Sequence, residues 1–539
     1  MTLPELLGAF SLAIDLGLGQ PMEHVLRSWR VAARLGDAVG LAEDQRDSLF
    51  HIAMLSWVGC VADAPEVANW FGDDIAFRAD SYDVELASLP GVGFFLGHAG
   101  RGGSVPTRVR KVASIMARGG LPVLRGIQSH CAATSLMAAR LGLSPEVCTA
   151  LGQFFTRWDG RGVPFGVRGE EIALTVRLIH LADVVEVRHR SAGVAGAVAV
   201  ARARRGGQFD PRLVDAFCTM AEEVLPALDD GAEPYDLILA EPSLRLPLTD
   251  AALDQALGVV ADFTDLRSTS RAGHSSAVAT LASDAARILH LGADDVVTLR
   301  RAALVHDIGL HGVPASILDK GEPLTRTERE LLMMSSYYTH RVLARPPSLA
   351  RIGAVASLAH ERMDGSGHHR GLTGSAIPMT GRVLAAADAY RTLLEPREGR
   401  PALSSRQAVD ALRSHVRAGR LDADAADAVL VAAGSATRRP VAGPAGLTRR
   451  EVEVLRLIAG GATTTQVASA IGVTRRTAGT HIERIYAKTG ASSRSTATLF
   501  ALRAGLLGPG TVVGTGVVGT GTVVGTGTVV GTGTEPPEA

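Results

Sequence analysis

The clearest chemical signal in this 539-residue chain is an adjacent pair, His306 and Asp307, at the end of an apolar helical run. An imidazole and a neighbouring carboxylate can face one divalent cation where a helix ends. His274 and Asp388 would supply ligands from other helices. This donor set suits Mn, Fe, Zn or Mg, and a cation held there can activate water and hold a phosphate. The pattern predicts a metal site of His274, His306, Asp307 and Asp388.

Several motifs surround these ligands in a fixed order. They are His274-Ser275, His306-Asp307-Ile308-Gly309, Leu324-Thr325 with Glu328, His360-Glu361, Asp364-Gly365-Ser366-Gly367 and Ala387-Asp388-Ala389-Tyr390. Over residues 250–434 the chain therefore resembles the HD superfamily, and more narrowly the HD-GYP group of cyclic-di-GMP phosphodiesterases. The resemblance implies a helical metal-dependent hydrolase fold, with Asp307 and His360 as the candidate catalytic residues.

The chain departs from the HD-GYP pattern at several ligand positions. The family has Lys where this chain has Leu310, His at Ser335, and Glu at Ser270 in its trinuclear members. Ala359 begins the His-His-Glu triplet, and Gly367-His368-His369 replaces Gly-Tyr-Pro. We expect one mononuclear site, with an empty, retained fold as the alternative. His368 and His369 are interpreted as exposed loop residues in preference to replacement ligands.

Residues 1–240 look like a second copy of the same unit. His24 to Ser56 and His274 to His306 both span 32 residues, and Asp159 to Asp183 and Asp364 to Asp388 both span 24. Trp57 to His130 spans 73 residues, whereas Asp307 to Ser335 spans 28, so the first copy carries an insert, expected around 61–110. Agreement of this kind favours an internal duplication.

The first copy retains His24, His130, Asp159 and Asp183 but places aromatic groups at ligand positions. Trp57 replaces the Asp of the His-Asp pair, and Phe154-Phe155-Thr156 replaces the Ala-His-Glu triplet. Bulky apolar groups are expected to fill the cavity instead of holding an ion. The first copy should therefore be inactive. It would sense a ligand or only pack against the second copy, and we favour packing.

A separate pattern occupies residues 447–507. Thr448 and Glu451 form a capping box, Gly460-Gly461 ends the first helix, Thr464 or Thr465 caps a short second helix, and Thr474 caps a third that runs to about Lys488. Over residues 446–507 there are nine basic and three acidic side chains. This layout lets a helix enter the major groove of DNA, and the local charge suits phosphate contact.

The same segment resembles the LuxR-type regulators along its whole length. The matching stretches are Leu447 to Leu455, Val467-Ala468, Thr474 to His481, Ile485-Tyr486 with Lys488, and Ser493-Arg494. The resemblance implies DNA contact by Arg475, Thr477, Thr480, Arg484 and Lys488, and dimerisation through the final helix near 495–507. Gly479 stands where the family often has Lys, and a helix-interior Gly costs about 1 kcal/mol relative to Ala.

The elements that carry these motifs indicate an all-α protein of three parts. We expect a degenerate HD-like domain over 1–240, an HD-like domain over 250–434, a linker over 435–446, the helix-turn-helix domain over 447–507 and a low-complexity Gly/Thr/Val tail over 508–539. Lys+Arg and Asp+Glu both total 55. With no basic leader and no long apolar run, a cytoplasmic protein is expected.

Three functions fit this organisation. The preferred hypothesis is a bacterial DNA-binding transcription regulator whose HD-like domains act as a regulatory metal- or nucleotide-binding module. Its partners would be double-stranded DNA, a second copy of the chain and a nucleotide effector. The alternatives are a metal-dependent phosphohydrolase or cyclic-di-GMP phosphodiesterase with a DNA-binding output domain, and a catalytically dead scaffold.

Overall fold

The computed structural model describes residues 1–117, 121–229, 235, 236, 238, 247–396, 401–435, 444–491, 493–504 and 506. Its contacts divide the chain into two compact units, Met1–Thr437 and Arg438–Ala539. Within the described ranges every regular element is a helix and the β pairings are isolated bridges. The all-α fold is thus confirmed. The predicted tail, most of the predicted linker and the expected boundary between the two copies lie outside the described residues.

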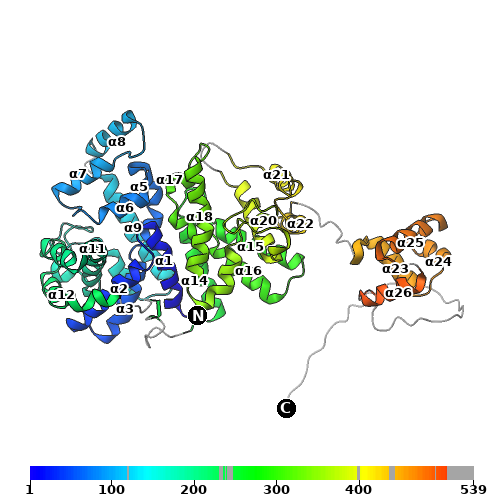
Figure 1. Ribbon diagram of the computed structural model, residues 1–539, viewed down its shortest axis with the longest axis horizontal. Coiled ribbons are helices and arrows are strands. Elements are labelled where there is room, and N and C mark those ends of the chain that lie inside the picture. The colour runs from blue at the N-terminus through cyan, green and yellow to red at the C-terminus, as the bar shows by residue number, and fades with distance from the viewer. Residues whose placement is uncertain are drawn as a thin grey trace, which may run out of the picture. The chain divides into compact units, whose positions relative to one another are not determined.

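The first repeat begins the first unit and contains the blue to teal helices of Figure 1. Its helices are α1 (Leu3–Gly17), α2 (His24–Ala38), α3 (Glu43–Leu55), α4 (Gly59–Ala62), α5 (Ala64–Phe71), α6 (Asp74–Ser81), α7 (Leu89–His98), α8 (Val105–Ala117), α9 (Leu121–Arg140), α10 (Pro145–Gly152), η1 (Gly169–Glu171), α11 (Leu174–Ala203), α12 (Pro211–Val224) and η2 (Pro226–Leu228).

The second repeat follows with the green to yellow helices. These are α14 (Asp250–Asp265), α15 (His274–Ile288), α16 (Ala293–Val305), η4 (Ile308–Gly312), α17 (Ala315–Leu318), α18 (Arg326–Leu343), η5 (Pro347–Leu349), α19 (Ala350–Ala356), η6 (Gly374–Ala376), α20 (Met379–Leu393), α21 (Ser405–Arg417) and α22 (Ala423–Ala432). Helices α2 and α15 each have 15 residues, and α3 and α16 each have 13. Matching lengths and positions support the duplication.

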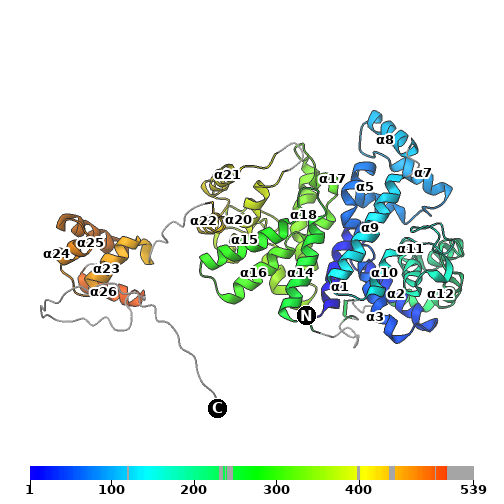
Figure 2. The same ribbon diagram turned by 180° about the vertical axis from the view of Figure 1, so that it is seen from behind.

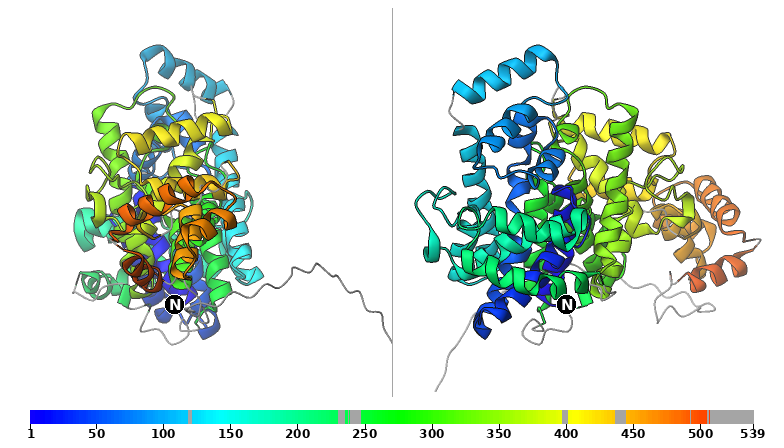
Figure 3. Two further views of the ribbon diagram at one scale, coloured as in Figure 1. Left: turned by 90° about the vertical axis from the view of Figure 1, so that its right-hand side faces the viewer. Right: turned by 60° about the vertical axis from the view of Figure 1, so that its left-hand side comes forward.

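The extra residues of the first repeat form helices α5 to α8, between α4 and α9. The insert thus extends to Ala117, somewhat beyond the range expected from spacing. Figure 3 shows α7 and α8 standing away from the rest of the repeat. Their exposed side chains include Leu89, Val105 and Val109.

The two repeats of the first unit pack against each other through buried contacts (Figure 2). Helix α1 packs on η4, α14 and α18. Asp74, at the start of the inserted helix α6, accepts a hydrogen bond from the Ala315 backbone N–H (2.8 Å) and forms an ion pair with Arg267 (2.7 Å). Because Asp74 and Arg267 are both buried, this pair ties the insert directly to the second repeat.

The second unit is a small helical domain with its own core. It contains η7 (Pro444–Gly446), α23 (Arg449–Ala459), α24 (Thr464–Ala470), α25 (Arg475–Thr489) and α26 (Arg494–Arg503). Its buried core includes Leu455, Ile458, Val467 and Ile485. Among the described residues no single helix is long and apolar enough to cross a membrane, although the bent pair Glu43–Ala62 and Ala64–Phe71 passes by length and composition.

Candidate metal centre and nucleic-acid interface

His274 is placed by a capped helix start. The backbone turns at Gly273, whose φ is +73°, and α15 begins with His274. Asp265 accepts hydrogen bonds from the Ser275 backbone N–H (2.9 Å) and the Ser275 hydroxyl (2.6 Å). These bonds fix the first turn, so the buried His274 ring faces inward.

His306 and Asp307 are placed by the end of α16 and a close approach of α18. The Gly309 N–H donates to the Thr339 hydroxyl (3.1 Å), which in turn donates to the His306 carbonyl (3.0 Å). A Cβ at Gly309 would lie 1.9 Å from the Ser335 carbonyl oxygen. Only glycine fits here, and the His-Asp pair is held where the sequence places it.

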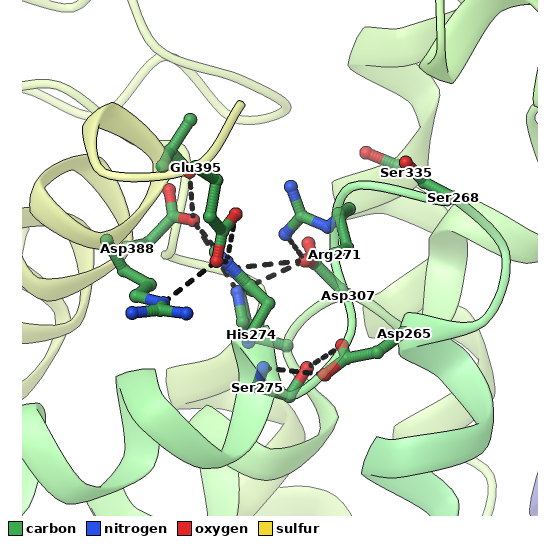
Figure 4. Close-up of polar contacts among 12 residues, drawn as sticks. Asp265, Ser268, Arg271, His274, Ser275, Asp307, Ser335, Asp388 and Glu395 are labelled. Atoms are coloured by element: carbon green, nitrogen blue, oxygen red, sulfur yellow. Dashed lines mark hydrogen bonds and ion pairs between the residues drawn. The ribbon is translucent and has the colours of Figure 1, made fainter. Parts of the chain in front are cut away.

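The four predicted ligands lie close together: Asp307 Oδ2 is 3.4 and 3.7 Å from the Nε2 atoms of His306 and His274, and the other three form a tighter group. One ligand atom each from His274, His306 and Asp388 lies within 4.8 Å of the others, and all three residues are buried. The Nε2 atoms of His274 and His306 lie 3.3 and 3.7 Å from Asp388 Oδ1. Figure 4 shows His274 between Asp388, Glu395 and Asp307.

The hydrogen bonds of the two imidazoles set their orientation for metal binding. His274 Nδ1 lies 3.0 Å from each Glu395 oxygen, and His306 Nδ1 lies 2.7 Å from the Ala303 carbonyl. Since both acceptors require an Nδ1–H, the Nε2 lone pairs remain available. Both Nε2 atoms are buried without a hydrogen-bond partner in the described structure. Two unsatisfied nitrogens beside a carboxylate fit one divalent cation.

The fourth predicted ligand, Asp307, is engaged differently. Its Oδ2 is contacted by the guanidinium of Arg271 (Figure 4). Burial alone would raise the pKa of Asp307, but Arg271 and the neighbouring imidazoles hold it well below its usual range. Asp307 is therefore ionised and already partnered by a cation. Sequence reasoning missed both Arg271 and Glu395, although each lies on a ligand-bearing segment.

His360 closes the cluster on its more exposed side. Its Nε2 lies 3.5 Å from Asp307 Oδ1 and its Nδ1 lies 3.5 Å from Asp388 Oδ2. Burial opposes a charge on this ring, but the two carboxylates raise its pKa to about 9. The His368 ring stacks on His360 with centroids 5.1 Å apart. The interpretation of His368 as an exposed loop residue was therefore wrong, because stacking and partial burial draw it into the site.

A cleft of about 480 Å³ opens onto this cluster. Arg362 lines it, and its guanidinium donates to the Ala359 and Glu361 carbonyls instead of to a carboxylate. Burial lowers the pKa of Arg362. Other lining residues are Ser268, Ser270, Arg271, Asp307, Lys320, Ser335, His360, His368 and Asp388. A cleft with a carboxylate-free arginine beside the ligand cluster can accommodate a phosphate group.

The equivalent cluster of the first repeat is closed by internal bonds. His24 Nδ1 lies 2.6 Å from Glu186 and its Nε2 lies 3.0 Å from Asp183. Trp57 Nε1 donates to the same Asp183 oxygen (2.9 Å). His130 lies apart, with Cys60 and Asp63, each offering an atom within 4.8 Å of the others. Neither nitrogen of His24 is thus free for a cation.

The aromatic residues of the first repeat do not fill its cavity, contrary to expectation. A cavity of about 280 Å³ remains, lined by Trp57, Phe154, Phe155 and other residues. The Trp57 ring meets Phe154 and Phe155 edge to face, with centroids 5.0 and 5.9 Å apart. The rings therefore pack against one another and line the cavity.

The second unit presents its third helix, α25, as an exposed basic surface. Thr474 caps this helix by accepting from the Thr477 N–H (3.2 Å). The predicted contact residues Arg475, Thr477, Thr480 and Arg484 are exposed, whereas Ala478 and Ile485 face the core. A Cβ at Gly479 would meet open space, so the missing side chain leaves a gap in the surface and no packing defect.

Caps hold the helix-turn-helix geometry. The predicted capping box of α23 is present, with reciprocal bonds between Thr448 and Glu451 (3.2 and 2.7 Å). Helix α24 is capped by Thr463 with Gln466, and not by Thr464 or Thr465 as expected. Lys488 forms an ion pair with Glu451 (2.6 Å) and so joins α25 to α23. Its predicted DNA contact stays a prediction.

Comparison with known proteins agrees with both units. Residues 258–425 match the HD domain family, and residues 445–501 match the bacterial regulatory proteins of the luxR family. The chain is 30% identical over 407 residues to 3′3′-cGAMP-specific phosphodiesterase 3 of Vibrio cholerae, covering 74% of this chain and 88% of that protein. A cyclic di-GMP phosphodiesterase of Thermotoga maritima is 33% identical over 145 residues, 26% of this chain and 39% of that protein.

A solved structure extends the similarity to both repeats. The crystal structure of a cyclic GMP-AMP-specific phosphodiesterase of Vibrio cholerae, V-cGAP3, aligns with a TM-score of 0.56 and 26% identity. The alignment covers 81% of this chain and 99% of that chain. The chain therefore belongs to the family of HD-domain proteins that includes 3′3′-cGAMP-specific phosphodiesterase 3, and it carries in addition a C-terminal domain of the luxR regulatory family.

Proposed function

We propose that this protein is a DNA-binding transcription regulator whose paired HD repeats form a metal- and nucleotide-binding regulatory module. The observation that carries the proposal is the capped helix α25, which presents Arg475, Thr477, Thr480 and Arg484 to solvent on a helix-turn-helix frame. A helix of this kind inserts into the major groove while neighbouring basic groups contact phosphates. The final helix α26 would pair two copies across DNA.

Selection of fragmented genomic DNA by the purified full-length protein tests this proposal. The bound fragments are then titrated at several salt concentrations with wild-type protein and with the Arg475→Ala/Arg484→Ala double variant. The loss of two phosphate or base contacts should weaken binding and reduce the salt slope by about two. The matched control is Arg326→Ala, which removes one exposed arginine from the first unit. No salt-sensitive DNA binding by the wild-type protein would overturn the regulator proposal.

A second candidate function is metal-dependent hydrolysis of a phosphodiester by the second repeat. It is favoured by the two unsatisfied Nε2 atoms beside Asp388 and by the cleft that opens onto them. His274, His306 and Asp388 would hold the ion, with Asp307 as a further ligand if Arg271 releases it. A divalent ion there would supply Lewis-acid activation of a phosphate ester.

The chain's own residues would then position the substrate. Arg362, which has no carboxylate partner among the described residues, would bind a phosphate oxygen, and Arg271 would offer a second cation. His360, held between two carboxylates, would be charged near neutral pH and could donate a proton to a leaving oxygen. Similarity to cyclic dinucleotide phosphodiesterases suggests 3′3′-cGAMP and cyclic di-GMP as substrates to test first.

Metal analysis of purified protein and of the His306→Ala variant tests the site, and hydrolysis of both cyclic dinucleotides with Mn²⁺ and Fe²⁺ tests the activity. Metal that is lost in His306→Ala supports the site, and turnover that is lost in Asp307→Ala supports the enzyme. Equal metal content in both proteins would remove the metal site. Metal binding without turnover would leave the regulator as the function of this module.

A further inference from the structure

The cavity of the first repeat has the composition of a ligand site. Its lining combines the rings of Trp57, Tyr82, Phe154 and Phe155 with three arginines and one buried carboxylate. Trp57 and Phe155 are only half-buried, so part of each ring faces the open space. Aromatic walls with a few polar groups are typical of pockets that bind flat organic molecules.

The carboxylate of Asp183 lies at the wall of this cavity, and only one of its two oxygens has hydrogen-bond partners. Its Oδ1 accepts from Trp57 Nε1 (2.9 Å) and contacts His24 Nε2 (3.0 Å) and the Tyr82 hydroxyl (3.3 Å). Its Oδ2 has no partner among the described residues, although Asp183 is only 5% exposed. Asp183 lines the open space of the cavity, where this oxygen could accept a hydrogen bond from a ligand N–H.

Arg204 supplies the complementary charge. It is 7% exposed and donates only to neutral oxygens, the Gln208 side-chain amide (3.1 Å) and the Tyr82 carbonyl (3.2 Å). Burial lowers its pKa, as expected for a guanidinium that contacts no carboxylate. The neighbouring Arg157, in contrast, is neutralised by Glu85 (2.6 Å) and Asp159 (3.1 Å). A buried, uncompensated guanidinium beside a cavity is suited to an anion.

The exposed side chain of Arg161 also lines this cavity. The cavity volume of about 280 Å³ lies just below the range of about 300–1,000 Å³ typical of sites for drug-sized ligands. The space thus suits one base with its sugar and phosphate, and it is too small to enclose two linked nucleotides.

We propose that the first repeat is a binding site for a nucleoside monophosphate, with the base against Trp57 and Phe155, a base N–H on Asp183 Oδ2 and the phosphate on Arg204 and Arg161. The site lies in a different repeat from the metal cluster and uses none of its residues. It gives the first repeat a sensory role, and its existence does not depend on metal binding or DNA binding elsewhere in the chain.

Isothermal titration of the full-length Asp388→Asn variant tests the proposal, since this background removes a central ligand of the metal cluster. AMP, GMP, CMP and UMP are compared with the corresponding nucleosides. At least one monophosphate should bind with one site per chain, and its nucleoside should bind about tenfold more weakly because the charge-assisted bonds are absent. Failure of all four monophosphates to bind at millimolar concentration would overturn the site.

Two neighbouring arginines give the matched variants. Arg204→Gln should weaken the monophosphate about tenfold and leave the nucleoside unchanged, whereas Arg205→Gln should change neither, because Arg205 forms an exposed pair with Asp215. If Arg204→Gln does not fold, the exposed Arg161→Gln should still weaken the monophosphate about threefold. Two results would contradict the placement of the phosphate. One is an equal loss of monophosphate affinity in Arg204→Gln and Arg205→Gln, and the other is unchanged affinity in both Arg204→Gln and Arg161→Gln.

Discussion

The two repeats of the first unit place a histidine at the same point of the same helix and use it in opposite ways. His24 in the first repeat satisfies both ring nitrogens with Glu186 and Asp183. His274 in the second repeat hydrogen-bonds only through Nδ1, to Glu395, and its Nε2 lies 3.3 Å from Asp388 without a hydrogen bond. The same frame thus holds a self-contained ion network in one copy and an unsatisfied donor set in the other.

The supporting charges are also exchanged between the repeats. In the first repeat Glu186 precedes Arg190 by four residues on α11, and in the second Arg391, in the last turn of α20, precedes Glu395 by four, just beyond the end of the helix. Each pair places its glutamate on the histidine Nδ1. A duplicated helix can therefore keep the partner of its histidine from either of two positions one turn apart, because residues four apart share a helix face. The repeats differ at the position after the end of the third helix of each repeat, where the first repeat has Trp57 and the second has Asp307.

The largest expected contrast is in stability. His24→Ala would leave two buried carboxylates without their shared partner, and breaking a buried ion pair costs about 3–5 kcal/mol. His306→Ala should cost clearly less in metal-free protein, because His306 Nε2 has no hydrogen-bond partner to lose. Chemical denaturation of the two variants, with chelator present, measures both. Equal destabilisation would show that the two histidines are bonded alike and would break the comparison.

The ion pairs of His24 predict a pH dependence for the first repeat. Carboxylate partners raise the pKa of His24 from 6.5 to about 10, against the effect of burial, so its stabilising contribution is complete below pH 6.5 and is lost as pH rises through 10. The stability gap between wild type and His24→Gln should therefore shrink between pH 7 and 10. Denaturation midpoints across this range measure the gap. A gap that widens with pH would contradict the assigned ion pair.

A metal ion at the His274 cluster should stabilise the protein through the second repeat. A divalent ion at about 100 times its Kd stabilises a folded protein by about 2.7 kcal/mol. Thermal unfolding with and without Mn²⁺ should show this increment in the wild type, no increment in His274→Ala, and a retained increment in Asp183→Asn. The last variant alters the equivalent cluster of the first repeat. Loss of the metal response in Asp183→Asn would show that the first repeat takes part in the metal site.

The smallest expected effect is on metal affinity, when the glutamates that hydrogen-bond to the histidine Nδ1 atoms are changed. Glu395→Gln should weaken metal binding about 10- to 100-fold, because the carboxylate orients His274 and raises its basicity. The matched change, Glu186→Gln, should leave metal affinity unchanged. Metal titrations of the two variants measure the effect of the single hydrogen bond between Glu395 and His274 on metal affinity. Unaltered affinity in Glu395→Gln would exclude an orienting role for this carboxylate.

Much of this organisation could be predicted from the sequence. Equal intervals between His24 and Ser56 and between His274 and His306 predict the duplication, because a helical repeat keeps its spacing. The Thr448–Glu451 capping box predicts the start of α23, because a cap is a local interaction between residues three apart. The ligands His274, His306 and Asp388 were likewise predicted to lie together, from the order of their motifs.

The tertiary structure alone decided what surrounds these ligands. Arg271 reaches Asp307 and Glu395 reaches His274 through contacts between segments distant in the sequence, and the loop after His360 folds back so that His368 stacks on it. The prediction that Trp57 and Phe155 fill their cavity was wrong for the same reason, since residue volume does not fix how rings meet. The sequence by itself determined the helices, the repeat and the candidate ligands. Only packing decided which polar atoms stay unsatisfied and which cavity stays open, because both depend on distances between helices that no local pattern encodes.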